Sequence, residues 1–314
     1  MHTTSNNLTH PLQQNAEWDE LQTVLLGIST DRGAVPQLAD AYDPTTRRTI
    51  MQDRFPSDKA LERSLNSFQL VLEEEGVCVL RPQNIHGVDQ IFARDVGFVV
   101  DDRFVVSSMI EDRQREWEGV QPLLGSYEVL QPPAEVQVEG GDVLVLPHAL
   151  IVGYSDEQEM QQFKTARTNR AALDWLSQQF PNRKVVGCQL IKSDHEVEQN
   201  VLHLDCGFMP LGLGHCLLFE KGFKDPEELQ ELRDELGKVS YLLLDRKEMI
   251  ELRSNLFSIR RDTVVSDLRF ERVNEWLRSE GYRVHELDLS PVGALGGLFR
   301  CTTLPLYREN ISNG

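Results

Sequence analysis

The 314-residue sequence is poor in positive charge, because its 32 lysines and arginines are outnumbered by 50 acidic residues and the formal net charge is −18. Binding to nucleic acid or to an anionic membrane surface needs clustered Lys and Arg on the protein side. The sequence therefore predicts neither partner. A cationic small molecule would be tolerated or weakly attracted, although acidity alone is also typical of many cytosolic proteins.

The sequence also lacks closely spaced cysteine pairs, long apolar runs and an apolar signal core. Its five cysteines predict a reducing compartment and not a disulfide framework or a zinc ribbon. No apolar run approaches the length of about 20 residues that spans a bilayer. We expect a cytoplasmic protein with a flexible N-terminal tail (1–16), a single catalytic domain (17–308) and a C-terminal tail (309–314).

A supersecondary unit recurs along the chain with a period of about 50 residues. In each unit, two short apolar strands form a hairpin, and a helical stretch and another strand follow. The hairpins are predicted at 96–106, 143–152, 208–219 and 256–265, with a degenerate first unit at 24–26 and a final strand at 296–299. Such a repeat predicts an α/β fold, a toroidal or solenoidal array of ββαβ-like units with their helices outside.

The connecting helices carry apolar residues at helical spacing. Ser57 is an N-cap signal before an apolar stripe that ends at Gly76, ahead of a strand at 77–80. The same pattern predicts helices at 168–180, 225–236 and 270–280, each followed by a strand.

Residues able to do chemistry stand at the entries of successive hairpins, and equivalent positions of such a repeat lie near one axis. They are Asp95, Glu139 with Asp142, His203 with Asp205, and Asn255, while Cys301 follows the glycines of the last segment.

Cys301 is the candidate nucleophile. A thiolate can attack an electron-poor sp² carbon when a neighbouring group, here His203, protonates the leaving group. Burial as a small core residue is the alternative for an isolated cysteine. Gly296 and Gly297 favour the catalytic interpretation, because glycine allows a close approach of backbone to a ligand.

His203 and Asp205 are predicted on one face of an extended segment, where they could serve one pocket. The alternatives are a surface ion pair, a buried histidine with satisfied hydrogen bonds, and a metal site formed with Cys206. Glu139 could orient His203, and Asp95 and Asp205 could clamp a guanidinium group from two directions.

Five segments taken together resemble the guanidine-modifying enzymes, namely arginine deiminases, dimethylarginine dimethylaminohydrolases and amidinotransferases. The segments are Phe-Ala-Arg-Asp (92–95), Glu-Gly-Gly-Asp-Val-Leu (139–144), Arg-Thr-Asn (167–169), His-Leu-Asp (203–205) and Gly-Gly-Leu-Phe-Arg-Cys-Thr-Thr-Leu-Pro (296–305). The resemblance spans residues 15 to 308, and the segments occur in the order of that family. It implies the family's fold, an α/β five-bladed ββαβ pseudo-symmetric propeller of the pentein type, which agrees with the repeat.

The resemblance implies Cys301 as nucleophile, His203 as acid and base, Glu139 as its carboxylate partner, and Asp95 with Asp205 as the guanidinium-binding pair. It implies a covalent amidino intermediate on the cysteine (a thiouronium) and requires no metal and no organic cofactor.

The acceptor of the amidino group decides the enzyme class. Glu139 with paired glycines resembles hydrolases that act on the C–N bonds of linear amidines, so we expect a deiminase-like or dimethylaminohydrolase-like hydrolase. The N-terminal segment and the segment after His203 resemble amidinotransferases as closely, so an amine acceptor stays open. A non-catalytic binding module of the same fold is the third alternative.

The expected substrate is arginine or a related guanidino compound. Arg113 and Arg167, predicted early in helices, could bind its α-carboxylate, although such arginines are often only solvated charges. Arg300 could lower the pKa of the adjacent Cys301 thiol. The apolar helices leave room for a homodimer.

Overall fold

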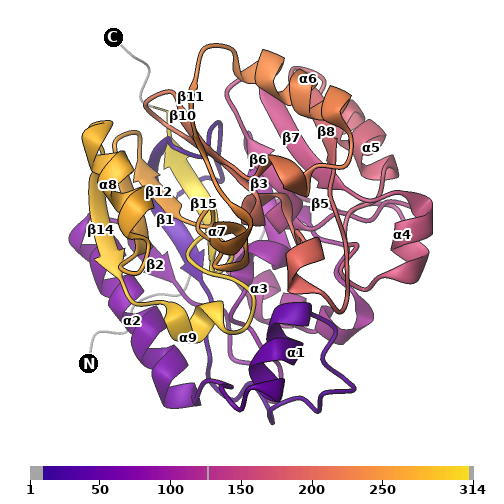
Figure 1. Cartoon of the computed structure of the whole chain (residues 1–314), viewed down its shortest axis with the longest axis vertical. Helices are drawn as coiled ribbons and strands as arrows, with labels where there is room; N and C mark the ends of the chain where they lie inside the picture. The colour runs from indigo at the N-terminus through magenta and orange to yellow at the C-terminus, as the bar shows by residue number, and fades with distance from the viewer. Residues whose placement is uncertain (1–9, 126, 311–314) are drawn as a thin grey trace.

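The computed structural model describes residues 10–125 and 127–310, and its strands form five three-stranded sheets arranged around an axis (Figure 1). In each sheet a middle strand pairs antiparallel with one neighbour and parallel with the other. The five sheets are β15-β1-β2, β3-β4-β5, β6-β7-β8, β9-β10-β11 and β12-β13-β14. This architecture confirms the predicted pentein-type propeller.

The strands are short and follow the predicted repeat. They are β1 (Glu20–Leu26), β2 (Cys78–Leu80), β3 (Gly97–Val100), β4 (Arg103–Val106), β5 (Val129–Leu130), β6 (Val143–Val145), β7 (Ala149–Tyr154), β8 (Lys184–Gln189), β9 (Phe208–Leu211), β10 (His215–Leu218), β11 (Ser240–Leu243), β12 (Phe257–Arg260), β13 (Thr263–Asp267), β14 (Arg283–Leu287) and β15 (Thr303–Glu309).

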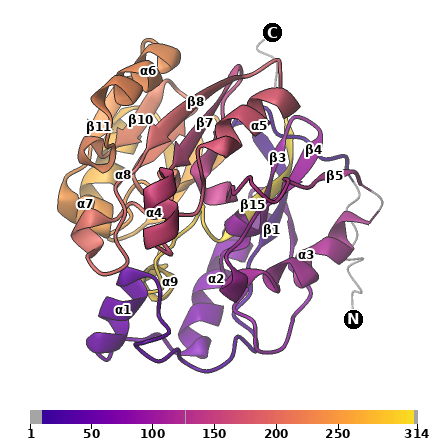
Figure 2. The ribbon, with the colours of Figure 1, turned by 90° about the vertical axis from the view of Figure 1, so that its right-hand side faces the viewer.

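Helices connect the second and third strands of the units. They are α1 (Pro44–Met51), α2 (Asp58–Glu74), α3 (Glu116–Leu124), α4 (Glu157–Gln162), α5 (Ala171–Gln179), α6 (Pro226–Leu236) and α8 (Glu271–Ser279), while α7 (Arg246–Ile250) and α9 (Ser290–Gly293) lie between successive units. Helices α2, α5, α6 and α8 lie on the periphery and the strands lie inside, as Figures 1 and 2 show.

Helix α2 illustrates how local sequence and burial agree. The Ser57 side chain accepts a hydrogen bond from the Ala60 amide and caps the helix. Its apolar stripe is buried against the sheets, and full burial of each such side chain contributes about 1.5–3 kcal/mol. The stripe comprises Leu61, Leu65, Phe68 and Leu72.

The first unit is completed by the end of the chain. Strand β15 pairs antiparallel with β1, so the last strand supplies the hairpin partner that the first unit lacks in sequence. The predicted strand at 296–299 is wrong, because this segment forms a turn and strand structure begins only at Thr303. The turn keeps the backbone of the glycine segment free to approach the site.

The predicted tail over residues 1–16 is wrong for residues 10–16, while residues 1–9 lie outside the described part. The Gln13 amide donates to the carbonyl of Leu306 at 3.0 Å, and Gln14 and Asp101 exchange two backbone hydrogen bonds. Leu12 and Ala16 are buried. At the other end, β15 extends through Glu309, one residue past the predicted boundary, and 311–314 are not described. No helix of the described residues is long and apolar enough to cross a bilayer.

Charged side chains occupy the interior between the sheets. The Arg300 guanidinium donates to Glu17 at 3.0 and 3.2 Å and to Asp205 at 2.8 Å, and all three residues are at most 3% exposed. Arg94 and Arg308 are buried nearby, and burial lowers the pKa of each below its ordinary value. Arg300 therefore connects the two ends of the chain to the turn that follows His203.

We expect Glu17→Ala to lower the free energy of unfolding by about 3–5 kcal/mol, because it leaves part of the buried Arg300 charge without a partner. Urea unfolding measured at pH 7 tests this. The exposed Glu62→Ala on α2 is the matched control and should change stability by at most about 0.5 kcal/mol. Equal, small losses in both variants would contradict a structural role for the Glu17–Arg300 pair.

Candidate active site

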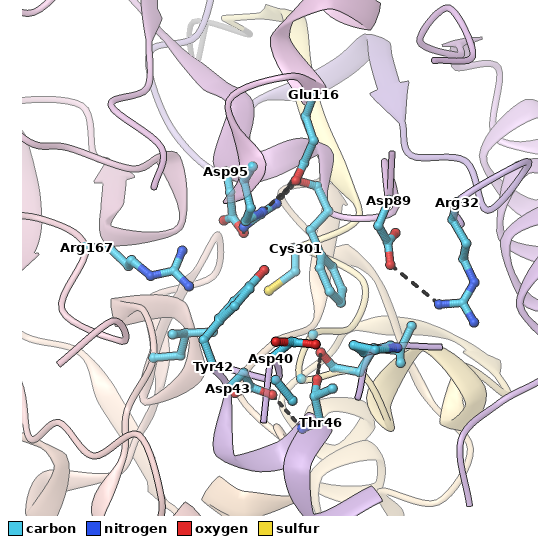
Figure 3. Close-up of a pocket in the computed structure, with 18 of the residues that line it drawn as sticks. Arg32, Asp40, Tyr42, Asp43, Thr46, Asp89, Asp95, Glu116, Arg167 and Cys301 are labelled. Carbon is cyan, nitrogen blue, oxygen red and sulfur yellow. Dashed lines mark hydrogen bonds and ion pairs between the residues drawn. The ribbon is translucent and has the colours of Figure 1, made fainter. Parts of the chain in front are cut away.

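A cavity of about 280 Å³ opens where the hairpin entries converge, and Figure 3 shows the Cys301 side chain among its charged walls. Cys301, His203, Asp95, Arg113 and Arg167 all line it. Glu139 and Asp205, which contact lining residues from behind, are completely buried. The structure therefore brings together all seven residues predicted from the sequence.

The turn that carries Cys301 depends on its glycines. Gly296 has φ of +96°, a conformation that side chains rarely adopt, and a Cβ on Gly297 would lie 2.5 Å from the Phe92 ring and 2.8 Å from the Cys301 Cβ. The Cys301 carbonyl accepts from the Arg94 amide at 3.0 Å. The backbone on both sides of the nucleophile is thus fixed.

The sulfur lies next to a carboxylate and not next to a cation. Its distances to Oδ2 and Oδ1 of Asp205 are 3.8 and 4.0 Å. A hydrogen bond with the Cys206 thiol lowers the pKa of Cys301, but burial and the carboxylates of Asp205 and Asp95 outweigh it and raise the pKa above its ordinary value. The expectation that Arg300 lowers this pKa is wrong, because the Arg300 guanidinium binds Glu17 and Asp205.

His203 lies between two carboxylates. Its Nε2 is 2.9 Å from Oε2 of Glu139, and its Nδ1 is 3.5 Å from Oδ1 of Asp95. Burial lowers the pKa of His203, but Asp95, Asp142 and Glu139 outweigh burial and raise the pKa to about 9. Burial raises the pKa of Glu139, but Arg167 and His203 outweigh it and lower the pKa to about 2. At neutral pH the pair is an imidazolium and a carboxylate, so His203 holds a proton that it can donate.

The position of the His203 imidazole explains why residue 141 is a glycine. A Cβ at this position would lie 2.6 Å from Cγ and Nδ1 of His203, so only glycine lets the imidazole pack against the turn. Sequence alone indicated no more than an ordinary turn at Gly140 and Gly141.

His203 and Asp205 reach the site in a different way from the one predicted. Residues Leu204–Cys206 form a 3₁₀ turn, not a strand with alternating faces. Asp142 accepts a hydrogen bond from the Leu204 amide at 2.9 Å, and the Lys192 ammonium donates to the carbonyls of Val201 and Leu202. His203 therefore faces the cavity, while Asp205 lies behind the sulfur.

The predicted carboxylate-binding arginines already contact protein carboxylates. Arg113 binds Glu116 through Nε and Nη2 and Asp95 through Nη1, at 2.6–2.9 Å. Arg167 donates from Nη1 to both oxygens of Glu139 at 3.1 Å. Neither lies inside a regular α-helix as expected, since Arg113 ends a 3₁₀ turn before α3 and Arg167 precedes α5.

Asp95 and Asp205, the predicted guanidinium clamp, also each bind an arginine of the protein. Oδ2 of Asp95 accepts from Arg113 at 2.7 Å, and Oδ2 of Asp205 accepts from Arg300 at 2.8 Å. The remaining oxygen of Asp95 is buried without a hydrogen-bond partner in the described residues. This oxygen is the free acceptor that faces the imidazole.

Sequence reasoning missed the arm between β1 and α2, residues 27–57, which contributes one wall of the cavity. Tyr42 and Asp43 line this wall, and the Arg167 guanidinium lies 5.3 Å from the centre of the Tyr42 ring (Figure 3). The Thr49 hydroxyl donates to the Ala294 carbonyl at 2.9 Å, so the arm docks beside the Cys301 turn. The Asp43-Pro44 pair is an N-cap and N1 signal that indicates α1 but not where the helix packs.

Among residues 10–125 and 127–310, two groups of side chains have donor atoms close enough for a metal. They are Asp95 with Glu139 and His203, and Asp205 with Cys206 and Cys301, each set within 4.8 Å. In both groups, however, carboxylates are already bound by the guanidinium groups of Arg113, Arg167 or Arg300. The predicted combination of His203, Asp205 and Cys206 is not one of them.

Comparison with known proteins shows which proteins this chain is similar to. No protein-family model matches it. YkgA of Bacillus subtilis, an uncharacterized protein, is 30% identical over 223 residues, which cover 70% of each chain. The bifunctional arginine dihydrolase/ornithine cyclodeaminase ArgZ of Synechocystis is 22% identical over 256 residues, 79% of this chain and 33% of ArgZ.

Solved structures with the same fold include enzymes of two kinds. SxtG, an amidinotransferase from Microseira wollei, matches with a TM-score of 0.74 and 18% identity over 96% of this chain and 98% of SxtG. The inosamine-phosphate amidinotransferase StrB1 of Streptomyces griseus matches with 0.72 and 20% over 95% and 97%. The N-terminal domain of ArgZ matches with 0.75 and 19% over 92% and 98%.

The fold is thus shared with solved amidinotransferases and with an arginine dihydrolase, and it is the fold that the sequence motifs predicted. Within that fold, the chain belongs to the same family as YkgA.

We expect the proton on His203 to stabilise the folded protein by up to about 3 kcal/mol, since the pKa rises from 6.5 to about 9 on folding. A raised folded-state pKa means that this stabilisation is fully present below pH 6.5 and is lost as the pH rises through about 9. The difference in unfolding free energy between wild type and His203→Gln should therefore shrink between pH 6 and pH 10. The exposed His148→Gln is the control and should follow the wild-type curve. A difference of the same size at both pH values would exclude a protonated His203 at neutral pH.

Proposed function

We propose that this protein is a guanidino-group-modifying hydrolase that acts on arginine or a related guanidino compound through a covalent amidino intermediate on Cys301. One observation carries the proposal: a buried thiol, an imidazole paired with Glu139 and the Asp95 carboxylate line one cavity, and the Asp205 carboxylate contacts the thiol from behind. The fold shared with arginine dihydrolase and amidinotransferases supports it. The ArgZ domain has been captured covalently bonded to a reaction intermediate.

In the first half-reaction, the substrate guanidinium binds between Asp95 and Asp205. Its positive charge offsets the two carboxylates that raise the pKa of Cys301, so the thiol releases its proton to solvent water and the thiolate forms where the electrophilic carbon lies. The thiolate adds to the central carbon, the C–N bond to the leaving amine breaks, and His203 gives this amine its proton. The product is an amidino group bonded to sulfur.

In the second half-reaction, neutral His203 takes a proton from water. The resulting hydroxide adds to the amidino carbon and the C–S bond breaks, which returns the thiolate. Glu139 stays ionised throughout, held by Arg167, and stabilises the imidazolium whenever it forms.

An amine acceptor is the second candidate, and the whole-length match to two amidinotransferase structures favours it. The chemistry up to the covalent intermediate is identical for both. Water and amine differ only in the nucleophile that enters the cavity after the first product leaves, and the Glu139-Gly140-Gly141 segment is the feature that favours water.

Arg167 is the better placed of the two proposed carboxylate-binding arginines. Arg113 uses Nε, Nη1 and Nη2 on Glu116 and Asp95, whereas the Arg167 hydrogen bonds to protein acceptors come from Nε and Nη1. An α-carboxylate could therefore bind Nη2 of Arg167 without breaking an existing contact.

Incubation with L-arginine, with and without glycine, should release products that depend on Cys301. Citrulline and ammonia identify a deiminase, ornithine and urea an amidinohydrolase, and glycine-dependent guanidinoacetate a transferase. We expect Cys301→Ala to lose at least about 10³-fold in turnover, because the covalent route is then closed. Mass analysis of small molecules and of intact protein provides the measurement.

The exposed Cys78→Ala variant is the matched control and should turn over like wild type. Methylated and other guanidines are tested next if arginine is inert. Turnover retained in Cys301→Ala would contradict the mechanism, and equal labelling of several cysteines by a haloacetamidine would favour a non-catalytic binding module.

Arg167→Ala should discriminate between substrates with and without a carboxylate. Loss of the Glu139 contact lowers kcat for every substrate, but loss of the carboxylate contact should lower kcat/KM for L-arginine by a further 10–100-fold, roughly, relative to 4-aminobutylguanidine. Exposed Arg170→Ala, close in sequence, should leave the ratio unchanged. Equal losses for both compounds would mean that Arg167 acts only through Glu139.

A further inference from the structure

Asn255 stands at the entry of the β12–β13 hairpin in the fifth unit, the place that Asp95 holds in the second unit. Its side chain is completely buried, and its Nδ2 lies 3.1 Å from Sγ of Cys301. Its Oδ1 accepts hydrogen bonds from the amides of Leu298 and Cys301, both at 3.2 Å. Asn255 thus contacts both the reacting sulfur and the turn that carries it.

These contacts determine the orientation of the amide. Two backbone N–H groups point at one atom of the side chain, and only the oxygen can accept them. The NH₂ group must therefore face the sulfur and can only donate to it. The adjacent Ser254 hydroxyl donates to the Asp205 carbonyl at 2.9 Å, so this dipeptide also fixes the carboxylate behind the sulfur.

The charges around the sulfur make such a donor valuable. The ionisable groups that face it are Asp205, Asp95 and the Cys206 thiol, and both carboxylates disfavour a thiolate. A lysine or arginine at the same place would favour the thiolate but would repel a cationic substrate. An amide N–H stabilises negative charge on sulfur without adding a positive charge to the pocket.

We propose that Asn255 is a further catalytic residue, which stabilises the Cys301 thiolate through Nδ2 and holds the nucleophile turn in place through Oδ1. The assignment rests on the proposed function in taking Cys301 as the nucleophile. It gives the fifth unit a role in the site equivalent to those of Asp95, Glu139 and His203 in the second, third and fourth units.

Asn255→Asp provides the sharpest test, because it keeps the size of the side chain and an oxygen for the two backbone amides but removes the donor to sulfur. Asn255→Ala removes the donor without adding a charge. In both variants we expect the pH midpoint for alkylation of Cys301 by iodoacetamide to rise by about one pH unit or more. The midpoint is measured by mass analysis of the peptide that contains Cys301.

Asn274→Ala is the matched control. Asn274 is equally buried and donates to the Asp267 carbonyl at 2.9 Å, but it lies on α8 away from the cavity. Its replacement should lower the melting temperature and leave the Cys301 midpoint unchanged. Melting curves recorded for all three variants separate loss of fold from loss of the donor.

Three results would overturn the role of Asn255. They are an unchanged midpoint in both variants, a shift in Asn255→Asp but not in Asn255→Ala, which would be an effect of the added charge, and a shift as large in Asn274→Ala. Alkylation needs no substrate, so this readout is independent of the search for an activity. Turnover retained in Cys301→Ala would end the proposed function while leaving the alkylation result interpretable.

Discussion

The buried pairing of guanidinium and carboxylate groups is the interaction on which the rest of this structure depends. Arg300 joins Glu17, near the start of the described chain, to Asp205 in the turn after His203, and Arg113 and Arg167 hold Asp95 and Glu139 in the same way. An unpaired charge at such depth would cost several kcal/mol. The Arg300–Asp205 pair requires two sheets to assemble together, while Arg113 and Arg167 each hold a carboxylate within their own unit, so the fold and the arrangement of the site depend on the same contacts.

In this site, guanidinium groups of the protein itself bind the carboxylates that are proposed to bind the guanidinium group of a substrate. The carboxylates proposed to bind a substrate guanidinium each already bind an arginine through one oxygen, with the second oxygen left toward the imidazole or the sulfur. Negative charge beside Cys301 keeps the thiol protonated until a cation arrives, because a thiolate next to Asp205 is unfavourable without one. In the proposed mechanism, a guanidinium in the cavity would thus make Cys301 more reactive at a given pH, because its positive charge favours the thiolate.

The sequence was sufficient for the repeat and for the residues that meet at the axis, since alternating apolar strands and helical stripes are local patterns and hairpin entries are equivalent by symmetry. It was misleading where the local structure depends on distant partners. The turn at Gly296 and Gly297 was expected to be a strand because an apolar pair follows, but contacts with Phe92 and Asn255 decide its form. Residues 10–16 look polar and loose, yet they are held by β15 and by Asp101. The position of Tyr42 could not be predicted, because the local sequence does not indicate where α1 packs.

Pseudo-symmetry explains why the few candidate site residues are spread over nearly the whole chain. Each hairpin entry is a tight turn at the axis, so it can present one or two side chains but cannot build a site alone. Asp95, Glu139, His203 and Asn255 come from four different units, and Cys301 comes from the segment that leads into the closing strand β15. Closure of the ring by β1 and β15 is therefore also the step that completes the site. Before that strand pairs, Cys301 has no fixed position relative to the His203 imidazole, so a partly folded chain would carry the candidate residues without the site that they form.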